Sequence, residues 1–364
     1  MRESASVPPS REREWRVTPA RTRSSKQLAV AALVLVALAT VACGNQDLPQ
    51  NALDPQGPDA RTLDKLWDLT FPFAVGVFFL VQGLVVFIIW RFRARSDDDA
   101  PVQVHGNAKA ELGWTIAPAL LLAVIGVFTV VTVFDINRRA EGSEVLQVKV
   151  SGHMWWWEFE YENFDIITAN ELHIPADQPV QLEVTSVDVI HSFWPPKLAG
   201  KVDAVPGRTN YMKLQADRPG VYAGQCAEFC GLSHANMRLT VVAHAPEDFR
   251  TWIRDQQREA APAAQGSEAA AGAELFVMKG CTGCHTISGV EGANGRIGPD
   301  LTHLYSRSKF AGAVFELTDK NLRKWLRDPP AMKPMVPDNG QGMPNLGLTE
   351  EEITSLIAYM ETLK

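Results

Sequence analysis

The sequence predicts a multi-domain membrane protein with a two-helix transmembrane hairpin, an all-β domain and an all-α C-terminal domain. Two uncharged apolar runs, residues 69–90 and 112–134, are each long enough to cross a membrane. Alternating apolar and polar residues with regular turn signals then extend over residues 145–243, and helical patterns occupy residues 270–364. Hydrophobic residues make up 46% of the 364, which fits soluble domains joined to a small membrane part.

The N-terminal residues 1–43 have the pattern of an export signal. Basic residues precede the apolar run Leu28–Ala42, which is too short to span a bilayer but suits the hydrophobic core of a signal peptide. Small residues then lead to Cys43, as at a lipoprotein cleavage site where the cysteine carries the lipid, although Thr40 stands where such sites usually have Leu. Residues 44–66 would then form the N-terminal segment of the mature chain.

The hairpin is predicted over residues 67–140. Basic residues in its loop place that loop in the cytoplasm by the positive-inside rule. They are Arg91, Arg93, Arg95 and Lys109. Basic residues on the outer flanks weaken this assignment, but an exported N-terminus leads to the same orientation. Everything after residue 135 is therefore expected outside the cell membrane.

Charge and cysteine usage narrow the class of protein. The net charge is −7, and no basic patch interleaved with aromatic residues is present, which argues against nucleic-acid binding. The acidic exterior either attracts a basic protein donor or serves solubility. Five cysteines argue against a simple disulfide framework, since their number is odd. Apart from Cys43, they form C-x-x-x-C at Cys226 and Cys230, and C-x-x-C-H at Cys281 and Cys284.

The segment from Cys226 to Met237 predicts a copper site. It brings two thiolates, the His234 imidazole and a thioether into one short stretch, and such soft ligands favour copper. The second cysteine, Cys230, exceeds what a mononuclear blue-copper site needs and suggests two coppers bridged by two sulfurs. His191 upstream would then supply the second imidazole, and a main-chain carbonyl would complete the set. A structural zinc site or an extracellular disulfide remain alternatives for the segment taken alone.

This run resembles the copper-binding loop of cytochrome c oxidase subunit II, and the resemblance covers roughly residues 60–250. Other segments match that family in the same order. They are Gly152-His-Met-Trp-Trp-Trp, Asp188-Val-Ile-His-Ser-Phe, Lys201-Val-Asp-Ala-Val-Pro-Gly-Arg and Gly220-Val-Tyr-Ala-Gly-Gln-Cys. The resemblance implies a cupredoxin domain over residues 141–250 that holds a dinuclear copper centre.

The resemblance also implies roles for individual residues. The implied copper ligands are His191, Cys226, Cys230, His234, Met237 and the Glu228 carbonyl. The Glu228 side chain is expected to reach a magnesium ion at the interface with the catalytic subunit. Trp155 matches the aromatic residue through which electrons arrive, although it could simply be a hydrophobic strand residue. Glu111 matches a carboxylate at the mouth of a proton channel in the neighbouring subunit, although it could simply be a helix-end charge.

The C-terminal domain carries a c-type haem attachment motif. In Cys281-Thr-Gly-Cys284-His285 the two cysteines form thioethers and His285 becomes the proximal iron ligand. A thioredoxin-like C-x-x-C is disfavoured because a His follows at once and no βαβ pattern is present. The domain resembles the cytochrome c fold over residues 270–364, after a linker over residues 251–269.

The second iron ligand is expected to be a methionine downstream, since Met/His ligation raises the reduction potential. Met343 in Gly-Met-Pro-Asn-Leu best matches the family pattern, and Met335 is the next candidate, ahead of Met332 and Met360. In Gly298-Pro-Asp-Leu, the Pro299 carbonyl is expected to hydrogen-bond His285 and fix its orientation.

Together these features are similar to subunit II of a proton-pumping terminal cytochrome c oxidase with a fused cytochrome c. As a subunit of that enzyme, the chain would pass electrons from its haem c to the copper centre and on to the oxygen-reducing site of subunit I. The implied partners are subunit I, subunit III and an upstream cytochrome or quinol-oxidising complex, at a bacterial inner membrane. Nitrous oxide reductase and a copper-delivery protein are the rival classes; the first lacks this hairpin and the second needs no haem.

Overall fold

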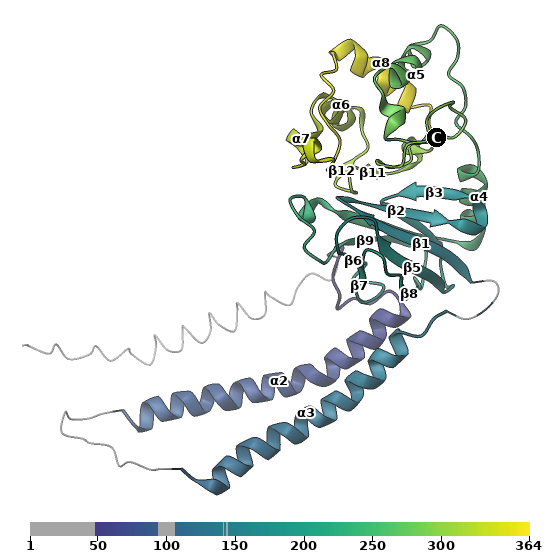
Figure 1. Cartoon of the computed structure of the whole chain (residues 1–364). Coiled ribbons are helices and arrows are strands. Elements are labelled where there is room, and N and C mark those ends of the chain that lie inside the picture. Colours follow the sequence, from purple (N-terminus) through teal and green to yellow (C-terminus); the bar gives the residue numbers. More distant parts are fainter. Residues whose placement is uncertain (1–47, 94–105, 141, 143–144) are drawn as a thin grey trace, which may run out of the picture. The chain divides into compact units, whose positions relative to one another are not determined.

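The computed structural model describes residues 48–93, 106–140, 142 and 145–364 (Figure 1). The predicted signal segment, Cys43 and Arg95 lie outside these residues. The described chain contains the three predicted kinds of structure: two long apolar helices, a β domain (residues 146–244) and a helical C-terminal domain (residues 268–364).

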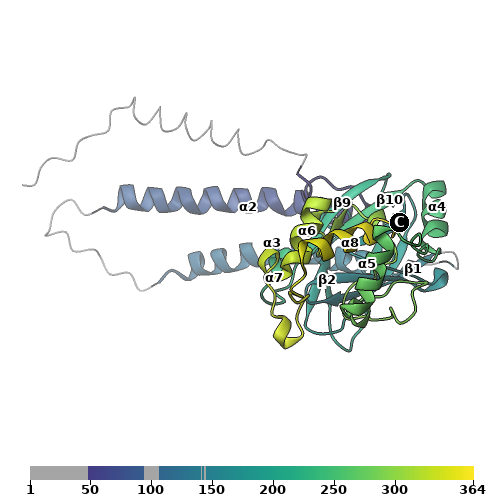
Figure 2. The same cartoon turned by 90° about the horizontal axis from the view of Figure 1, so that it is seen from above.

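The two long helices are α2 (Pro58–Arg91) and α3 (Ala108–Ile136), both longer than the predicted apolar runs because polar turns extend them. Each contains a window apolar and long enough to cross a membrane. Their apolar side chains are exposed over the whole circumference, with Phe79 at 68% and Phe134 at 72%. A helix that is apolar on every side requires an apolar environment. Figures 1 and 2 show the pair running alongside one another, as a hairpin requires.

The β domain is a sandwich of two five-stranded sheets. One sheet has the strand order β3-β2-β1-β5-β8 and the other β4-β10-β9-β6-β7. The strands are β1 (Leu146–His153), β2 (Trp156–Tyr161), β3 (Ile166–Ala169), β4 (Glu171–Pro175), β5 (Val180–Ser186), β6 (His191–Trp194), β7 (Val202–Ala204), β8 (Asn210–Leu214), β9 (Gly220–Cys226) and β10 (Arg238–His244). Trp157, Phe159 and Phe193 are fully buried between the sheets and make edge-to-face contacts.

The second sheet brings distant residues to one end. β6 and β10 both pair with β9 in antiparallel fashion, so the start of β6 and the start of β10 lie beside the end of β9. His191 begins β6, Cys226 ends β9, and Met237 directly precedes β10. The loop between β9 and β10 therefore closes over the position of His191.

Helix α4 (Pro246–Gln256) occupies the first part of the predicted linker. Phe249, Trp252 and Ile253 recur at helical spacing and pack against the core of the β domain. Ala260 N donates to the Ser288 carbonyl, at 3.0 Å, and the next helix begins at Glu268. The structure thus shortens the predicted linker to roughly residues 257–267.

The C-terminal domain packs its helices around a small core. Its helices are α5 (Glu268–Met278), α6 (Asp319–Arg327), α7 (Pro329–Met332) and α8 (Glu350–Met360), with the short hairpin β11 (Lys309–Phe310) and β12 (Phe315–Glu316) (Figure 1). Helix α8 begins with a capping box, in which Thr349 is the N-cap and the Glu352 side chain accepts the Thr349 N–H. Gly272 lets α5 approach α8 closely, because a Cβ atom there would lie 2.6 Å from the Ser355 carbonyl carbon.

Candidate copper and haem sites

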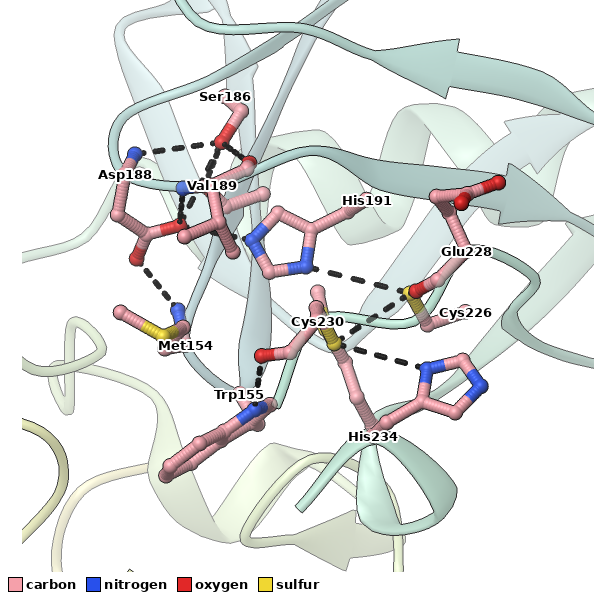
Figure 3. A network of polar contacts seen from close by, with 12 residues as sticks. Met154, Trp155, Ser186, Asp188, Val189, His191, Cys226, Glu228, Cys230 and His234 are labelled. Carbon is pink, nitrogen blue, oxygen red and sulfur yellow. Dashed lines mark hydrogen bonds and ion pairs between the residues drawn. The ribbon is translucent and has the colours of Figure 1, made fainter. Parts of the chain in front are cut away.

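The structure brings the predicted copper-binding side chains together at the end of the second sheet. The Cys226 and Cys230 sulfurs lie 3.8 Å apart. His191 Nδ1 lies 3.9 Å from the Cys226 sulfur, and His234 Nδ1 lies 3.6 Å from the Cys230 sulfur. Figure 3 shows these four side chains converging from β6 and from the loop after β9. Each sulfur thus has its own imidazole, which is the symmetry expected of a site for two metal ions.

The remaining predicted donors flank the two sulfurs. Met237 Sδ lies 3.8 Å from the Cys230 sulfur, and Met237 is completely buried. The Glu228 carbonyl oxygen lies 3.2 Å from the Cys226 sulfur, while the Glu228 side chain is exposed. The set therefore has one weak donor beside each sulfur. Thiolate, imidazole and thioether donors in this arrangement fit copper better than a four-ligand zinc site.

The two cysteines are not joined as a disulfide, since that bond would place the sulfurs about 2 Å apart. The hydrogen bond between them lowers the pKa of Cys226 and raises the pKa of Cys230, and burial and the charge on Cys226 raise the Cys230 pKa further. The pair therefore loses its first proton easily and its second with difficulty in the absence of a cation. Metal binding favours both thiolates, so it couples to release of that second proton.

Asp188 orients one imidazole of the site. Its Oδ1 lies 2.8 Å from His191 Nε2, and its other oxygen accepts the Met154 N–H at 2.7 Å. Burial opposes protonation of His191, but the hydrogen bonds to Asp188 and Cys226 raise the His191 pKa. Because Nε2 faces the carboxylate, Nδ1 is the nitrogen left for a metal. Asp188 was not among the residues predicted for the site, although a carboxylate three residues before a ligand histidine is a signal that the sequence carries.

Trp155 lies beside the copper-ligand loop and not merely in a hydrophobic strand. Its side chain is 3% exposed, and Nε1 donates to the Cys230 carbonyl at 2.8 Å. Trp155 also lines the large cavity described below, which is shared between the β domain and the C-terminal domain. This tryptophan therefore hydrogen-bonds a copper-loop residue and borders the cavity that contains the haem attachment motif.

The haem attachment motif lies at the end of α5, where His285 faces a cavity of about 850 Å³. His285 Nδ1 lies 2.8 Å from the Pro299 carbonyl, the hydrogen bond expected from the sequence. This bond makes Nδ1 the donor and leaves Nε2 as the metal-binding nitrogen. Burial lowers the His285 pKa, which keeps the imidazole neutral. Gly298 is required here, because a Cβ atom would lie 2.5 Å from the imidazole.

The cavity is lined by Cys281, Cys284, His285 and mostly apolar residues of the C-terminal domain, and it extends to β-domain residues that include Trp155 and Glu158. Such a lining fits a large, flat, mostly apolar group bound through its edge. Of the four candidate methionines, Met335, Met343 and Met360 line the cavity. Met343 packs against the core of the C-terminal domain, and its sulfur accepts the Trp325 Nε1–H at 3.2 Å. Met335 instead packs against the core of the β domain, which favours Met343 as the iron ligand.

Glu111 lies in the first turn of α3, where its Oε1 accepts the Asn107 N–H at 3.0 Å. This bond satisfies a free N–H at the helix terminus and so accounts for a carboxylate at this position on structural grounds.

Two helices long enough to span a membrane, a sandwich with a candidate copper site and a domain with a haem attachment motif together define a membrane-bound electron-transfer protein. Three family models match it in the same order. Residues 47–131 match "Cytochrome C oxidase subunit II, transmembrane domain", residues 165–244 match "Cytochrome C oxidase subunit II, periplasmic domain", and residues 269–364 match "Cytochrome c". These families imply a copper centre in the β domain and a haem in the C-terminal domain.

Curated relatives agree. Cytochrome c oxidase subunit 2 of Alkalihalophilus pseudofirmus is 36% identical over 86% of this chain and 90% of its own length. Cytochrome c oxidase subunit 2 of Bacillus subtilis is 33% identical over 91% of this chain and 96% of its own length. Quinol oxidase subunit 2 of Bacillus subtilis is also 33% identical, over 65% of this chain and 75% of its own length. The chain belongs to the cytochrome c oxidase subunit II family, as a subunit of a haem-copper oxidase that associates with a subunit I.

Proposed function

We propose that this chain accepts electrons at a haem held by Cys281, Cys284 and His285, and delivers them through Trp155 to a dinuclear copper centre. The observation that carries the proposal is the position of Trp155. It lines the haem cavity and hydrogen-bonds the carbonyl of Cys230. The proposed copper ligands are His191, Cys226, Cys230, His234, Met237 and the Glu228 carbonyl, and Met343 is the proposed second iron ligand.

The protein's part in this reaction is to hold both centres in one geometry. When bound, two coppers sharing two thiolates spread one electron over both ions, which limits geometric change on reduction. Asp188 and Pro299 fix the imidazoles of His191 and His285 through their second nitrogens. Trp155 itself is buried and so is shielded from water.

A photochemical reduction of the haem in the purified enzyme tests this order of transfer. The haem is expected to be reduced first and then reoxidised with the same time course as copper reduction, followed through the near-infrared copper absorption. Copper reduction that is independent of haem reoxidation would contradict the proposal.

The full reaction extends to a partner subunit. From the copper centre, electrons would pass to the haem-copper site of subunit I, where oxygen is reduced to water with proton translocation, in an assembly that also contains subunit III. Glu111 is proposed to lie at the opening of a proton channel of subunit I. The exposed Glu228 side chain is free to reach a magnesium ion at the subunit interface.

The donor and the location are likewise proposed from the fused haem domain and the hairpin. The donor would be an upstream cytochrome or quinol-oxidising complex, and relatives are named for both cytochrome c and quinol. The hairpin would lie in a bacterial inner membrane with the residues after α3 on its outer side, and Cys43 would carry a lipid anchor.

A further inference from the structure

The C-terminal domain contacts the copper-ligand loop directly. Ser233 Oγ donates to the Pro334 carbonyl at 2.5 Å, and Arg238 N donates to the Gly312 carbonyl at 2.9 Å. Ser233 and Arg238 are sequence neighbours of the proposed copper ligands His234 and Met237. Two segments of the haem-carrying domain, 311–313 and 333–335, therefore lie against the loop that holds copper.

Lys333 makes the central contact of this region. It is 3% exposed, and its Nζ donates to the Trp155 carbonyl at 2.6 Å and to the Ala311 carbonyl at 3.0 Å. No carboxylate accepts a hydrogen bond or ion pair from it among the residues that the structure describes. Burying an ammonium group is costly unless hydrogen bonds replace its water. Here the Trp155 carbonyl of the β domain and the Ala311 carbonyl of the C-terminal domain supply these hydrogen bonds. The ammonium group of Lys333 therefore keeps both acceptors only while the two domains are in contact.

The backbone around Lys333 is shaped to this contact. Ala311, Gly312 and Ala313 have φ values of +55°, +80° and +55°, a left-handed backbone conformation that residues other than glycine rarely adopt. A Cβ atom at Gly312 would lie 2.7 Å from the Asn236 carbonyl oxygen and 2.9 Å from the Trp155 carbonyl oxygen. Such strained conformations persist where surrounding contacts hold them. The segment is thus fitted to the surface formed by Trp155 and the copper-ligand loop.

The residue that Lys333 holds is the one that connects the two sites. Trp155 donates from Nε1 to the Cys230 carbonyl and accepts from Lys333 at its own carbonyl. On the other side, Lys333 lies two residues before Met335, which lines the haem cavity with Met343. Two hydrogen bonds through Trp155 therefore connect the distal wall of the haem cavity with a copper-ligand residue.

We propose that Lys333 is a positioning residue that holds the haem domain at a fixed separation from Trp155 and the copper loop. This inference rests on the proposed function and deepens it. Electrons would pass from haem to copper while the haem domain is docked on the β domain. They would not depend on random encounters of a haem domain that moves freely on its linker. Because the rate of electron transfer falls steeply with distance, a looser contact lowers the rate without altering either centre.

Other contacts between the domains lie elsewhere on the β domain. Glu171 Oε1 accepts hydrogen bonds from Ser308 N at 2.8 Å, Ser308 Oγ at 2.5 Å and Lys309 N at 3.2 Å. Arg296 Nη2 lies 3.1 Å from the Glu158 carboxylate. These contacts are independent of Lys333, so its replacement is expected to loosen the domains locally and not to separate them.

The test compares Lys333→Met with Lys320→Met in the assembled, fully loaded enzyme. Lys320 is an exposed lysine of α6 in the same domain and serves as the matched control. Haem-to-copper electron transfer is measured after photochemical reduction of the haem. We expect Lys333→Met to slow this step by roughly ten-fold or more. Lys333→Met should not change the rate at which an external reductant reduces the haem, the optical spectra of haem and copper, or the copper EPR signal. Lys320→Met should behave as wild type in every measurement.

A wild-type rate in Lys333→Met would overturn the inference, as would an altered copper or haem spectrum, which would make Lys333 a support of a metal site. Gly312→Ala provides a second test, because its methyl group would lie 2.6 Å from Lys333 Nζ and 2.9 Å from the Trp155 carbonyl oxygen, within the same contact. It should also slow the step and weaken the relaxation enhancement that oxidised haem exerts on the copper EPR signal; wild-type values for both would overturn the inference. If wild-type enzyme passed no electron from haem to copper, the proposed function itself would be contradicted.

Discussion

The copper site and the haem site are built by different means. At the copper site, four side chains from two neighbouring strand ends and one loop place adjacent sulfur and nitrogen atoms 3.6–3.9 Å apart. At the haem site, the chain provides a cavity of about 850 Å³ in which His285 is oriented by a hydrogen bond to the Pro299 carbonyl and Met343 accepts one from Trp325. The first site is defined by donor atoms and the second mainly by shape and attachment points.

This difference shows what each part of the fold contributes. A β sandwich with a buried core can place several small donors accurately, because strand pairing fixes where each strand ends. The C-terminal domain is small, and its core side chains line the cavity, so the bound group would form part of that core. We therefore expect the copper site to tolerate little change in its ligands, and the haem domain to depend more on its occupant.

The largest effect is expected from Cys230→Ser. Loss of a bridging thiolate should abolish the dinuclear centre and lower oxidase turnover by more than about 100-fold, since loss of a residue that only orients a metal ligand already costs roughly 10- to 100-fold. EPR spectroscopy and oxygen consumption measure the two effects. Haem content and haem reduction should be unchanged, and retention of a coupled copper pair in this variant would break the proposed ligand assignment.

Paired substitutions of Met343→Leu and Met335→Leu sharpen the haem side of the comparison. Met343→Leu should remove the far-red absorption band of methionine-ligated ferric haem and lower the reduction potential by on the order of a tenth of a volt, within the ~0.8 V range that axial ligands span. Met335→Leu should leave both unchanged. The reverse outcome would assign the second iron ligand to Met335.

Asp188→Asn tests the orientation of His191. The amide carries no negative charge and is therefore a weaker acceptor for Nε2–H, so the imidazole is held less firmly in its preferred tautomer and direction. Copper affinity, measured by competition with a chelator, should fall by roughly 10- to 100-fold. Glu162→Gln, at an exposed carboxylate of the same domain, is the control; equal affinities for the two variants would exclude a role for Asp188.

A smaller effect is expected in the β domain, where His244 Nε2 lies 2.8 Å from His173 Nδ1 beside helix α4. Burial, reinforced by His173, lowers the His244 pKa to about 4 from its ordinary 6.5. The unfolded chain then binds more protons between these two values, so stability is lost as the pH falls from 6.5 toward 4. His244→Gln should make the thermal midpoint less dependent on pH in this range. An unchanged dependence would contradict the assignment.

The elements and motifs that depend on neighbouring residues could be predicted from the sequence. The structure contains the two apolar helices, the strands and the capping box at Thr349. It also contains the hydrogen bond that His285 Nδ1 donates to the Pro299 carbonyl. Donors grouped between Cys226 and Met237 indicated copper by their chemistry alone. His191 was proposed as the second imidazole and matched by the family resemblance, but its position beside these donors follows from the pairing of β6 with β9 and not from any local pattern.

The contacts between domains could not be predicted in this way. The pairing of Lys333 with the Trp155 carbonyl joins residues 178 positions apart, and no local pattern indicates it. Helix α4 was missed because its polar residues and the alanine-rich stretch after it are typical of a linker. The spacing of Phe249, Trp252 and Ile253 was the available signal, since it forms one apolar helix face.

The central claim is that one chain carries a dinuclear copper centre and a covalent haem in electronic communication. An EPR and optical spectrum of the purified enzyme, with copper and iron quantified in the isolated chain, tests it most directly. The account predicts the hyperfine pattern of one electron shared by two copper nuclei, near-infrared copper absorption, and two coppers for each covalently bound haem. A mononuclear copper spectrum, or a chain with no covalent haem, would contradict it.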